Sequence, residues 1–98
     1  MTYRNRKLLD LAHSMPCMAP FPHDCHAHLG CDPAHSDSSF FGRGHGHKSH
    51  DFAFAAMCNN AHMALGRMGR ELKFGEWMRA YVKTQVYLWE NNLIGVMK

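Results

Sequence analysis

The sequence predicts a small α+β domain, in which a metal-stapled finger lies between an N-terminal helix and a long C-terminal helix. Its 98 residues form one domain with room for only a modest core. Apolar residues make up 46%, too many for a disordered chain, and much of this content lies toward the two ends. The stretch from Cys17 to His62 is rich in Gly, His and Ser and holds all four cysteines and eight of the nine histidines. Such a stretch cannot bury an ordinary core, and metal ligation is the economical way to staple it.

Composition also bounds the location and the partners of the chain. The basic start at Tyr3–Lys7 is not followed by a long apolar run, so we expect no export signal. No stretch approaches the ~20 apolar residues that cross a bilayer, so we expect no membrane partner. A cytoplasmic protein keeps its thiols reduced, which favours metal over disulfides. The formal net charge of +3 permits nucleic acid as a partner without requiring it.

The first predicted element is a helix over residues 4–15. Its apolar face is formed by Leu8, Leu9, Leu11, Ala12 and Met15. Pro16 ends it, because the residue before a proline disfavours the helical region. The basic side chains of Arg4, Arg6 and Lys7 lie on the other face, where they are either solvated or in contact with phosphate.

Residues 16–33 are predicted to form turns and loop, because they contain all four prolines of the chain and Gly30. Within this segment, Cys17 and Cys25 bracket a knuckle longer than the usual spacer between zinc-binding cysteines. The pair is therefore a weak zinc signal by itself, and it gains strength from Cys58 downstream.

A glycine-rich run follows, in which glycine occupies every second position from Gly42 to Gly46. Such backbone can take positive φ and approach another group closely. Arg43 and Lys48 bracket the run with positive charge. The run is interpreted either as a loop that cradles phosphate or as an ordinary flexible surface loop.

The downstream half is predicted to be mostly helical. Asp51–Met57 is strongly apolar and indicates a short strand or the lead-in to a helix, which delivers Cys58 to the core. A helix is expected from residue 59 or 60 to about 68, weakened by glycine. Residues 70–73 are expected to form a connector.

The strongest predicted helix spans about 74–93 and ends at Gly95. Its apolar residues recur at three- and four-residue spacing. They are Phe74, Trp77, Met78, Tyr81, Val82, Gln85, Leu88 and Trp89, with one amide among them. We interpret this stripe as a core-packing face rather than a platform for stacking bases.

The middle of the chain contains residues that could bind a zinc ion. Cys58 and His62 are four residues apart, so on a helix they share a face and can reach one ion. With Cys17 and Cys25 they make a tetrahedral Cys3His site, which places a metal-binding core within residues 16–69. Cys31 and His23 are the other candidates for the fourth ligand.

A second constellation consists of His35, Asp51 and His62. They occur in the order of an HNH site, in which the first histidine activates water and the last binds a divalent ion at the scissile phosphate. With nine histidines in the chain, this order alone is a weak signal.

Most of the chain, however, resembles small phage and prophage proteins of the HNH, treble-clef nuclease class. The residues that carry this resemblance are Cys17-x7-Cys25, Ala34-His35, the Gly42–Lys48 loop leading to Asp51, Cys58 with His62, and the tail Arg79–Gln85. The resemblance implies a ββα-metal fold, a structural zinc and metal-dependent cleavage of DNA in phage recombination or DNA processing. It also implies a bacterial host cytoplasm and allows association with host or phage recombination proteins.

The resemblance gives the residues of the second constellation their expected roles. Neutral His35 takes a proton from water, which attacks a phosphodiester held by Mg²⁺ or a similar ion on His62. Asp51 orients His35 or helps to hold the ion. Arg43 and Lys48 contact the DNA backbone.

One position departs from the family pattern, because Ala61 stands where the family has its fourth zinc thiolate. Either Cys31, His23 or another group completes the zinc site, or His62 is drawn into it and the catalytic ion loses its ligand. The second case would leave a non-catalytic zinc finger that binds DNA or protein. A metal carrier or sensor is the third interpretation, given nine His, four Cys and eight Met.

Overall fold

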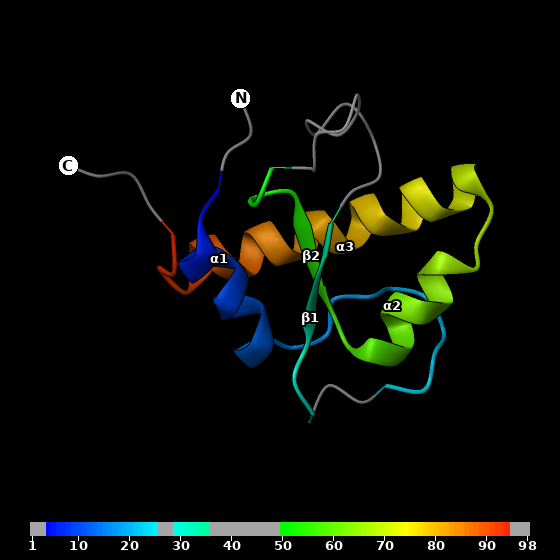
Figure 1. Cartoon of the computed structure of the whole chain (residues 1–98), viewed down its shortest axis with the longest axis horizontal. Coiled ribbons are helices and arrows are strands. Elements are labelled where there is room, and N and C mark those ends of the chain that lie inside the picture. Colours follow the sequence, from blue (N-terminus) through cyan, green and yellow to red (C-terminus); the bar gives the residue numbers. More distant parts are fainter. Residues whose placement is uncertain (1–3, 26–28, 36–49, 95–98) are drawn as a thin grey trace.

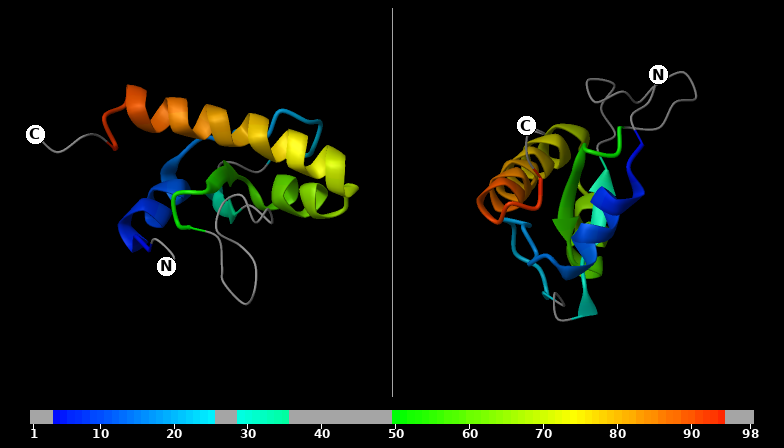
Figure 2. Two further views of the ribbon diagram at one scale, coloured as in Figure 1. Left: turned by 90° about the horizontal axis from the view of Figure 1, so that it is seen from above. Right: turned by 90° about the vertical axis from the view of Figure 1, so that its left-hand side faces the viewer.

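A computed structural model describes residues 4–25, 29–35 and 50–94 (Figure 1). The elements follow in the order α1 (Arg6–Leu11), the 3-10 turn η1 (Ala12–Ser14), β1 (Asp32–His35), β2 (Phe54–Met57), α2 (Asn59–Gly66) and α3 (Arg70–Glu90). The two strands form an antiparallel ribbon that lies between α3 and the N-terminal α1–η1 segment (Figure 2). The α+β class is therefore confirmed. In the described part of the chain, no helix is long and apolar enough to cross a membrane.

The N-terminal helix is shorter than the predicted span of 4–15. The Asn5 side chain caps α1 by accepting a hydrogen bond from the Leu8 backbone N–H at 3.2 Å. After Leu11 the chain tightens into η1 and then becomes extended at Met15, immediately before Pro16. Leu8, Ala12 and Met15 are buried against the ribbon, so this segment packs as its apolar face predicts.

The hydrogen-bonding pattern of the β-ribbon explains how β1 can contain a proline. The strands pair with His35 opposite Phe54 and Pro33 opposite Ala56. Ala56 directs its hydrogen bonds away from β1, because its carbonyl accepts from the Met18 N–H at 2.8 Å and its N–H donates to Thr84 Oγ1. Pro33 therefore occupies a non-hydrogen-bonded pair, where the missing N–H costs nothing. The predicted loop of 16–33 is wrong at its end, where β1 begins, whereas the strand interpretation of Asp51–Met57 is confirmed for Phe54–Met57.

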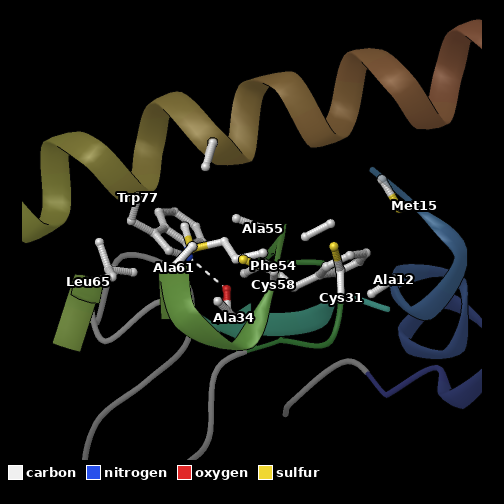
Figure 3. Close-up of a cluster of buried hydrophobic side chains, with 14 of the residues drawn as sticks. Ala12, Met15, Cys31, Ala34, Phe54, Ala55, Cys58, Ala61, Leu65 and Trp77 are labelled. Carbon is white, nitrogen blue, oxygen red and sulfur yellow. Dashed lines mark hydrogen bonds between the residues drawn. The ribbon is translucent and has the colours of Figure 1, made fainter. Parts of the chain in front are cut away.

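Every residue of β2 is buried, and two of its four side chains are small. Ala55 and Ala56 have no exposed surface. Helix α3 is joined to the ribbon by a hydrogen bond from Trp77 Nε1 to the Ala34 carbonyl at 2.8 Å (Figure 3). Thr84 adds a second link between the helix and β2. This core fixes the ribbon and the start of α2 relative to α3.

Helix α3 begins earlier and ends earlier than predicted. Residues 70–73, predicted to be a connector, form its first turn, since Gly69 is extended and its carbonyl accepts from the Lys73 N–H at 2.8 Å. The helix ends at Glu90 because Asn92 takes a left-handed conformation with φ of 55°. The Leu93 N–H then donates to the Leu88 carbonyl at 2.9 Å, which closes a Schellman motif. The predicted stop at Gly95 lies outside the described residues.

The buried face of α3 overlaps only in part with the predicted stripe. Trp77 and Leu88 are buried as predicted, together with Ala80 and Thr84. Val82 and Trp89 are about half exposed, so their assignment to the core was wrong. The reason is that the ribbon is two strands wide and can cover only one narrow face of the helix.

Thr84 should contribute measurably to stability. It has no exposed surface, accepts the Ala56 N–H at 3.0 Å and donates to the Ala80 carbonyl at 2.8 Å. We expect Thr84→Val to lower the free energy of unfolding by about 1–3 kcal/mol, because it leaves a buried N–H unpaired. Urea unfolding of the zinc-loaded protein measures this loss. Thr84→Ser keeps the hydroxyl and is the control, and an equal loss in both variants would contradict the role of the hydrogen bond.

Candidate metal centre

Four side chains from the knuckle and the start of α2 converge on one point. The thiols of Cys17, Cys25 and Cys58 and an imidazole nitrogen of His23 all lie within 4.8 Å of one another. All four cysteines of the chain are free thiols. Three sulfurs and one ring nitrogen are the donor set of a Cys3His zinc site. The predicted convergence of the three thiols is therefore found, and the group is a possible zinc site.

His23 supplies the nitrogen, and its ring is held in the orientation that ligation requires. Its Nδ1 lies 2.8 Å from the Phe21 carbonyl, to which it donates. The opposite nitrogen, Nε2, lies 3.6 Å from Cys17 Sγ and is left with a lone pair. A hydrogen bond of this kind on the far nitrogen is a common feature of metal-ligating histidines.

Hydrogen bonds attach the knuckle to the ribbon and to α2. The Met18 N–H donates to the Ala56 carbonyl, and Asn60 Nδ2 donates to the Asp24 carbonyl at 2.8 Å. The Cys58 N–H points at Cys17 Sγ from 3.4 Å, as backbone donors do toward zinc thiolates. Three contacts thus fix the knuckle around the point where the four side chains meet.

One edge of the donor group has the length that a tetrahedral ion requires. Zinc bonds of about 2.3 Å to sulfur and about 2.0 Å to nitrogen give tetrahedral edges of about 3.5–3.8 Å, and the Cys17–His23 separation has this length. Burial raises the pKa of the Cys17 thiol, although the backbone N–H groups of Cys58 and Ala19 offset part of the rise. A bound cation would favour the thiolates that burial disfavours.

His62, predicted to be a zinc ligand, is not a member of this group within the described ranges. The prediction assumed that Cys58 and His62 share a helical face. Cys58 is instead the N-cap of α2, with extended backbone at φ −65° and ψ 163°, so its side chain leaves the chain in a different direction. Ala61 is fully buried in the core, and the fourth donor comes from His23, one of the two alternatives.

Cys31, the other alternative, is a buried core thiol. It has no exposed surface, and burial raises its pKa to about 12, with further repulsion from Cys17 and Cys58. A thiol with so high a pKa stays protonated at neutral pH. Cys31 therefore packs beside the metal-binding group as an apolar side chain.

His35 stands at the other end of β1, opposite Phe54. Burial lowers the pKa of its imidazole below the ordinary 6.5, although the nearby Asp51 carboxylate acts in the opposite direction. Its Nε2 is buried and has no hydrogen-bond partner among residues 4–25, 29–35 and 50–94. An unpaired buried nitrogen of this kind calls for an explanation, since such groups are nearly always hydrogen-bonded.

Asp51 lies near His35 but is held by the N-terminal segment. Its carboxylate accepts from Arg4 at 2.8 Å and from the backbone N–H of Asn5, and it is almost fully buried. Burial alone would raise the pKa of Asp51, but the Asn5 hydrogen bond and the Arg4 charge lower it overall. Asp51 is thus a fixed negative charge whose oxygens are already engaged. Arg4, a candidate for phosphate contact, pairs with Asp51 instead.

His62 projects from α2 toward the start of β1. Its Nδ1 lies 3.8 Å from Asp32 Oδ2, and both side chains are partly exposed. Repulsion from His62 makes a minor contribution to the lowered pKa of His35. Arg43 and Lys48, predicted to contact DNA, lie outside the described residues.

Sequence reasoning missed Asp32 and the pairing of Arg4 with Asp51. Asp32 follows Cys31 in a segment predicted to be loop, and only the pairing of Asp32 with Met57 brings it beside α2. No local pattern could have revealed this, because the register of a ribbon depends on the long connection between its strands. Arg4 is one of several basic residues near the start, and nothing in its spacing selects Asp51 as its partner.

The fold and its site define the chain as a small α+β protein with a Cys3His group able to hold a metal. No family model matches this sequence, and no characterised protein or solved structure shows significant similarity to it.

The titration of His35 gives a test of this arrangement. We expect an imidazole pKa below 6.5 in the folded protein, and a still lower value in Asp51→Asn, because the Asp51 charge raises it. The unfolded chain then binds a proton that the folded protein does not, so stability should fall as the pH drops below about 6.5. NMR titration of the ring protons measures both values. A higher pKa in Asp51→Asn would contradict the arrangement.

Proposed function

We propose that this protein is a metal-dependent endonuclease that hydrolyses DNA phosphodiester bonds, with a structural zinc held by Cys17, His23, Cys25 and Cys58. The observation that carries the proposal is the buried Nε2 of His35, which has no hydrogen-bond partner among the described residues. It lies at the end of the first strand of a β1–β2–α2 unit whose helix begins at a candidate zinc ligand. This order of elements agrees with the ββα-metal architecture that the resemblance to HNH nucleases implies.

His35 has the properties of a general base. Its lowered pKa keeps the ring neutral at pH 7, so Nε2 carries a lone pair that would take a proton from a water molecule admitted to this buried atom. The fixed carboxylate of Asp51 then stabilises the imidazolium that forms. Because the oxygens of Asp51 are bound to Arg4 and Asn5, we assign it this electrostatic role and not the alternative of holding the ion.

His62 and Asp32 are the residues that would hold the divalent ion. Octahedral Mg²⁺ with bonds of about 2.1 Å places neighbouring donors about 3.0 Å apart, so these two side chains, 3.8 Å apart, would move closer by about 0.8 Å to share one ion. A Mg²⁺ or similar ion bound there supplies the positive charge that polarises the scissile phosphate. Asp32 thereby takes the carboxylate role considered for Asp51.

DNA is the proposed partner, and phage recombination or DNA processing the proposed setting, both from the resemblance alone. Arg43 and Lys48 would contact the phosphate backbone, which positions DNA without reading its sequence. A bacterial cytoplasm and contact with recombination proteins belong to the same proposal.

A non-catalytic zinc module that binds DNA or protein is the second candidate function. The exposure of the His62–Asp32 pair favours it, because partly exposed ion pairs are common on surfaces that bind no ion. In that case the Cys3His group alone would organise the fold. The two functions differ in their need for an added divalent ion.

Nicking of supercoiled plasmid by zinc-loaded, desalted protein tests the proposal. We expect open-circular product when Mg²⁺ or Mn²⁺ is added and none when it is left out. The protein without the added ion is the control, and it keeps its zinc. His62→Ala and Asp32→Asn should each raise the Mg²⁺ concentration needed for half-maximal cleavage, because each removes one ligand of the ion. If the protein binds DNA but does not nick it under any ionic condition, the catalytic proposal is wrong and the non-catalytic binding module is favoured.

A further inference from the structure

Helix α3 carries a second apolar face on the side opposite the core. Val82, Val86 and Trp89 are 53%, 48% and 50% exposed. At 100° per residue they lie about half a turn from the buried residues Thr84 and Leu88. No other described element runs along the outer side of the C-terminal half of α3 (orange in Figure 2). These side chains therefore form an unpartnered seam on the surface.

The spacing along this seam, four residues and then three, is that of a coiled-coil interface. Lys83 and Glu90, both exposed, lie on one flank. Arg79, which is paired with Glu76, occupies the a position before Val82 and ends the apolar run there. Gln85 on the other flank is uncharged. In heptad notation, Val82, Val86 and Trp89 occupy positions d, a and d. Lys83 and Glu90 both occupy position e, seven residues apart and opposite in charge.

We propose that this seam binds a second copy of the chain, with the two α3 helices antiparallel. If Val86 of each copy faces Trp89 of the other, the two-fold axis passes between these positions. The same alignment places Lys83 of each copy beside Glu90 of the other, because flanking e positions pair with each other in antiparallel coiled coils. One helix thus supplies both halves of two symmetry-related ion pairs, which is the self-complementarity that a two-fold interface requires.

Charge selects this alignment over the neighbouring ones. Shifting one copy by a heptad, so that Val82 faces Val86, brings Lys83 against Lys83 and costs repulsion. A parallel pair brings Glu90 beside Gln85 and Lys83 beside Met78, so it forms no ion pair. Among these three alignments, only the antiparallel one centred between Val86 and Trp89 gains two ion pairs.

The seam is short, which bounds the strength of the dimer. Two helix ends bury less than the ~800 Å² per partner of a standard interface, so we expect a reversible dimer with a dissociation constant in the micromolar range or weaker. Trp89 is the expected anchor, since a large aromatic residue at the centre of an interface carries much of its energy. The seam faces away from the ribbon, so dimerisation leaves the metal-binding group and His35 uncovered. The inference is independent of the proposed nuclease activity.

Sedimentation equilibrium of the zinc-loaded full chain over a range of concentrations tests the proposal. We expect a monomer–dimer equilibrium for the wild type and a monomer for Val86→Glu, which places a charge at the centre of the seam. Circular dichroism and zinc content of Val86→Glu should equal those of the wild type, since Val86 is not part of the core. A monomeric wild type at all concentrations, or a dimer unaffected by Val86→Glu, would overturn the proposal.

Charge reversal then tests the alignment. Lys83→Glu and Glu90→Lys should each weaken the dimer about tenfold, because each variant faces like charge across the axis. The double variant restores both ion pairs with their signs exchanged and should return to wild-type affinity. Single variants without effect, or a double variant that fails to recover, would contradict the antiparallel arrangement.

Discussion

Replacement of Cys25 by alanine is expected to abolish tight zinc binding and to unfold the knuckle. Cys25 is exposed, so its thiol contributes little to apolar packing, and any large effect must arise from ligation. Structural zinc supplies on the order of 10 kcal/mol of folding free energy in small metal-stapled domains. Loss of one of the four donors Cys17, His23, Cys25 and Cys58 should therefore lower zinc affinity by orders of magnitude. Competition with a chromophoric chelator measures the affinity, and thermal unfolding measures the stability.

Cys31→Ala is the matched control. Cys31 is fully buried, so without a metal it would be the more important of the two cysteines for stability. We expect the reverse order: Cys31→Ala keeps one tightly bound zinc per chain and loses only about 1–2 kcal/mol for the sulfur-sized cavity. A Cys25→Ala protein that still binds zinc tightly, beside a Cys31→Ala protein that does not, would show that the ligand set is assigned wrongly. A metal carrier or sensor would instead bind several labile ions in both variants.

Replacement of His35 by alanine is expected to lower the rate of DNA cleavage by about 10²–10⁴-fold, the usual contribution of a general base. Zinc content and helical structure should not change, because His35 is not in the Cys3His group and its Nε2 holds no described side chain in place. The thermal midpoint should not fall by much either, since the variant also removes a buried nitrogen that has no partner in the described structure. Plasmid nicking with added Mg²⁺ measures the rate.

The control for the loss of an imidazole is His13→Ala. His13 lies on η1, where its Nδ1 contacts the Cys31 carbonyl at 3.0 Å. It belongs neither to the His35–Asp51 pair nor to the His62–Asp32 pair. We expect the His13 variant to cleave at the wild-type rate. Cleavage by the His35 variant at that same rate would show that another group activates the water, and the assignment of the base would fail.

Much of the fold follows from local pattern alone. The apolar spacing near the start, the proline that ends it, and the long amphipathic run near the end predict α1 and α3, because helices are local structures with a period that a sequence displays. The concentration of cysteine and histidine predicts a metal-stapled middle for a similarly local reason. Three of the four grouped ligands, Cys17, Cys25 and Cys58, are recognisable by residue type.

The tertiary structure decided what depends on pairing between distant segments. His23 rather than His62 completes the Cys3His group, because Cys58 is an N-cap and because the Phe21 carbonyl orients the His23 ring. The ribbon register places Asp32 beside His62, and Asp51 pairs with Arg4, which lies 47 residues away in the sequence. Periodicity predicted one broad apolar stripe on α3, but the narrow ribbon covers only part of it and leaves Val82 and Trp89 half exposed. In each case local sequence limits the conformations that a segment can adopt, while the choice of partner is a free-energy balance over the whole folded chain.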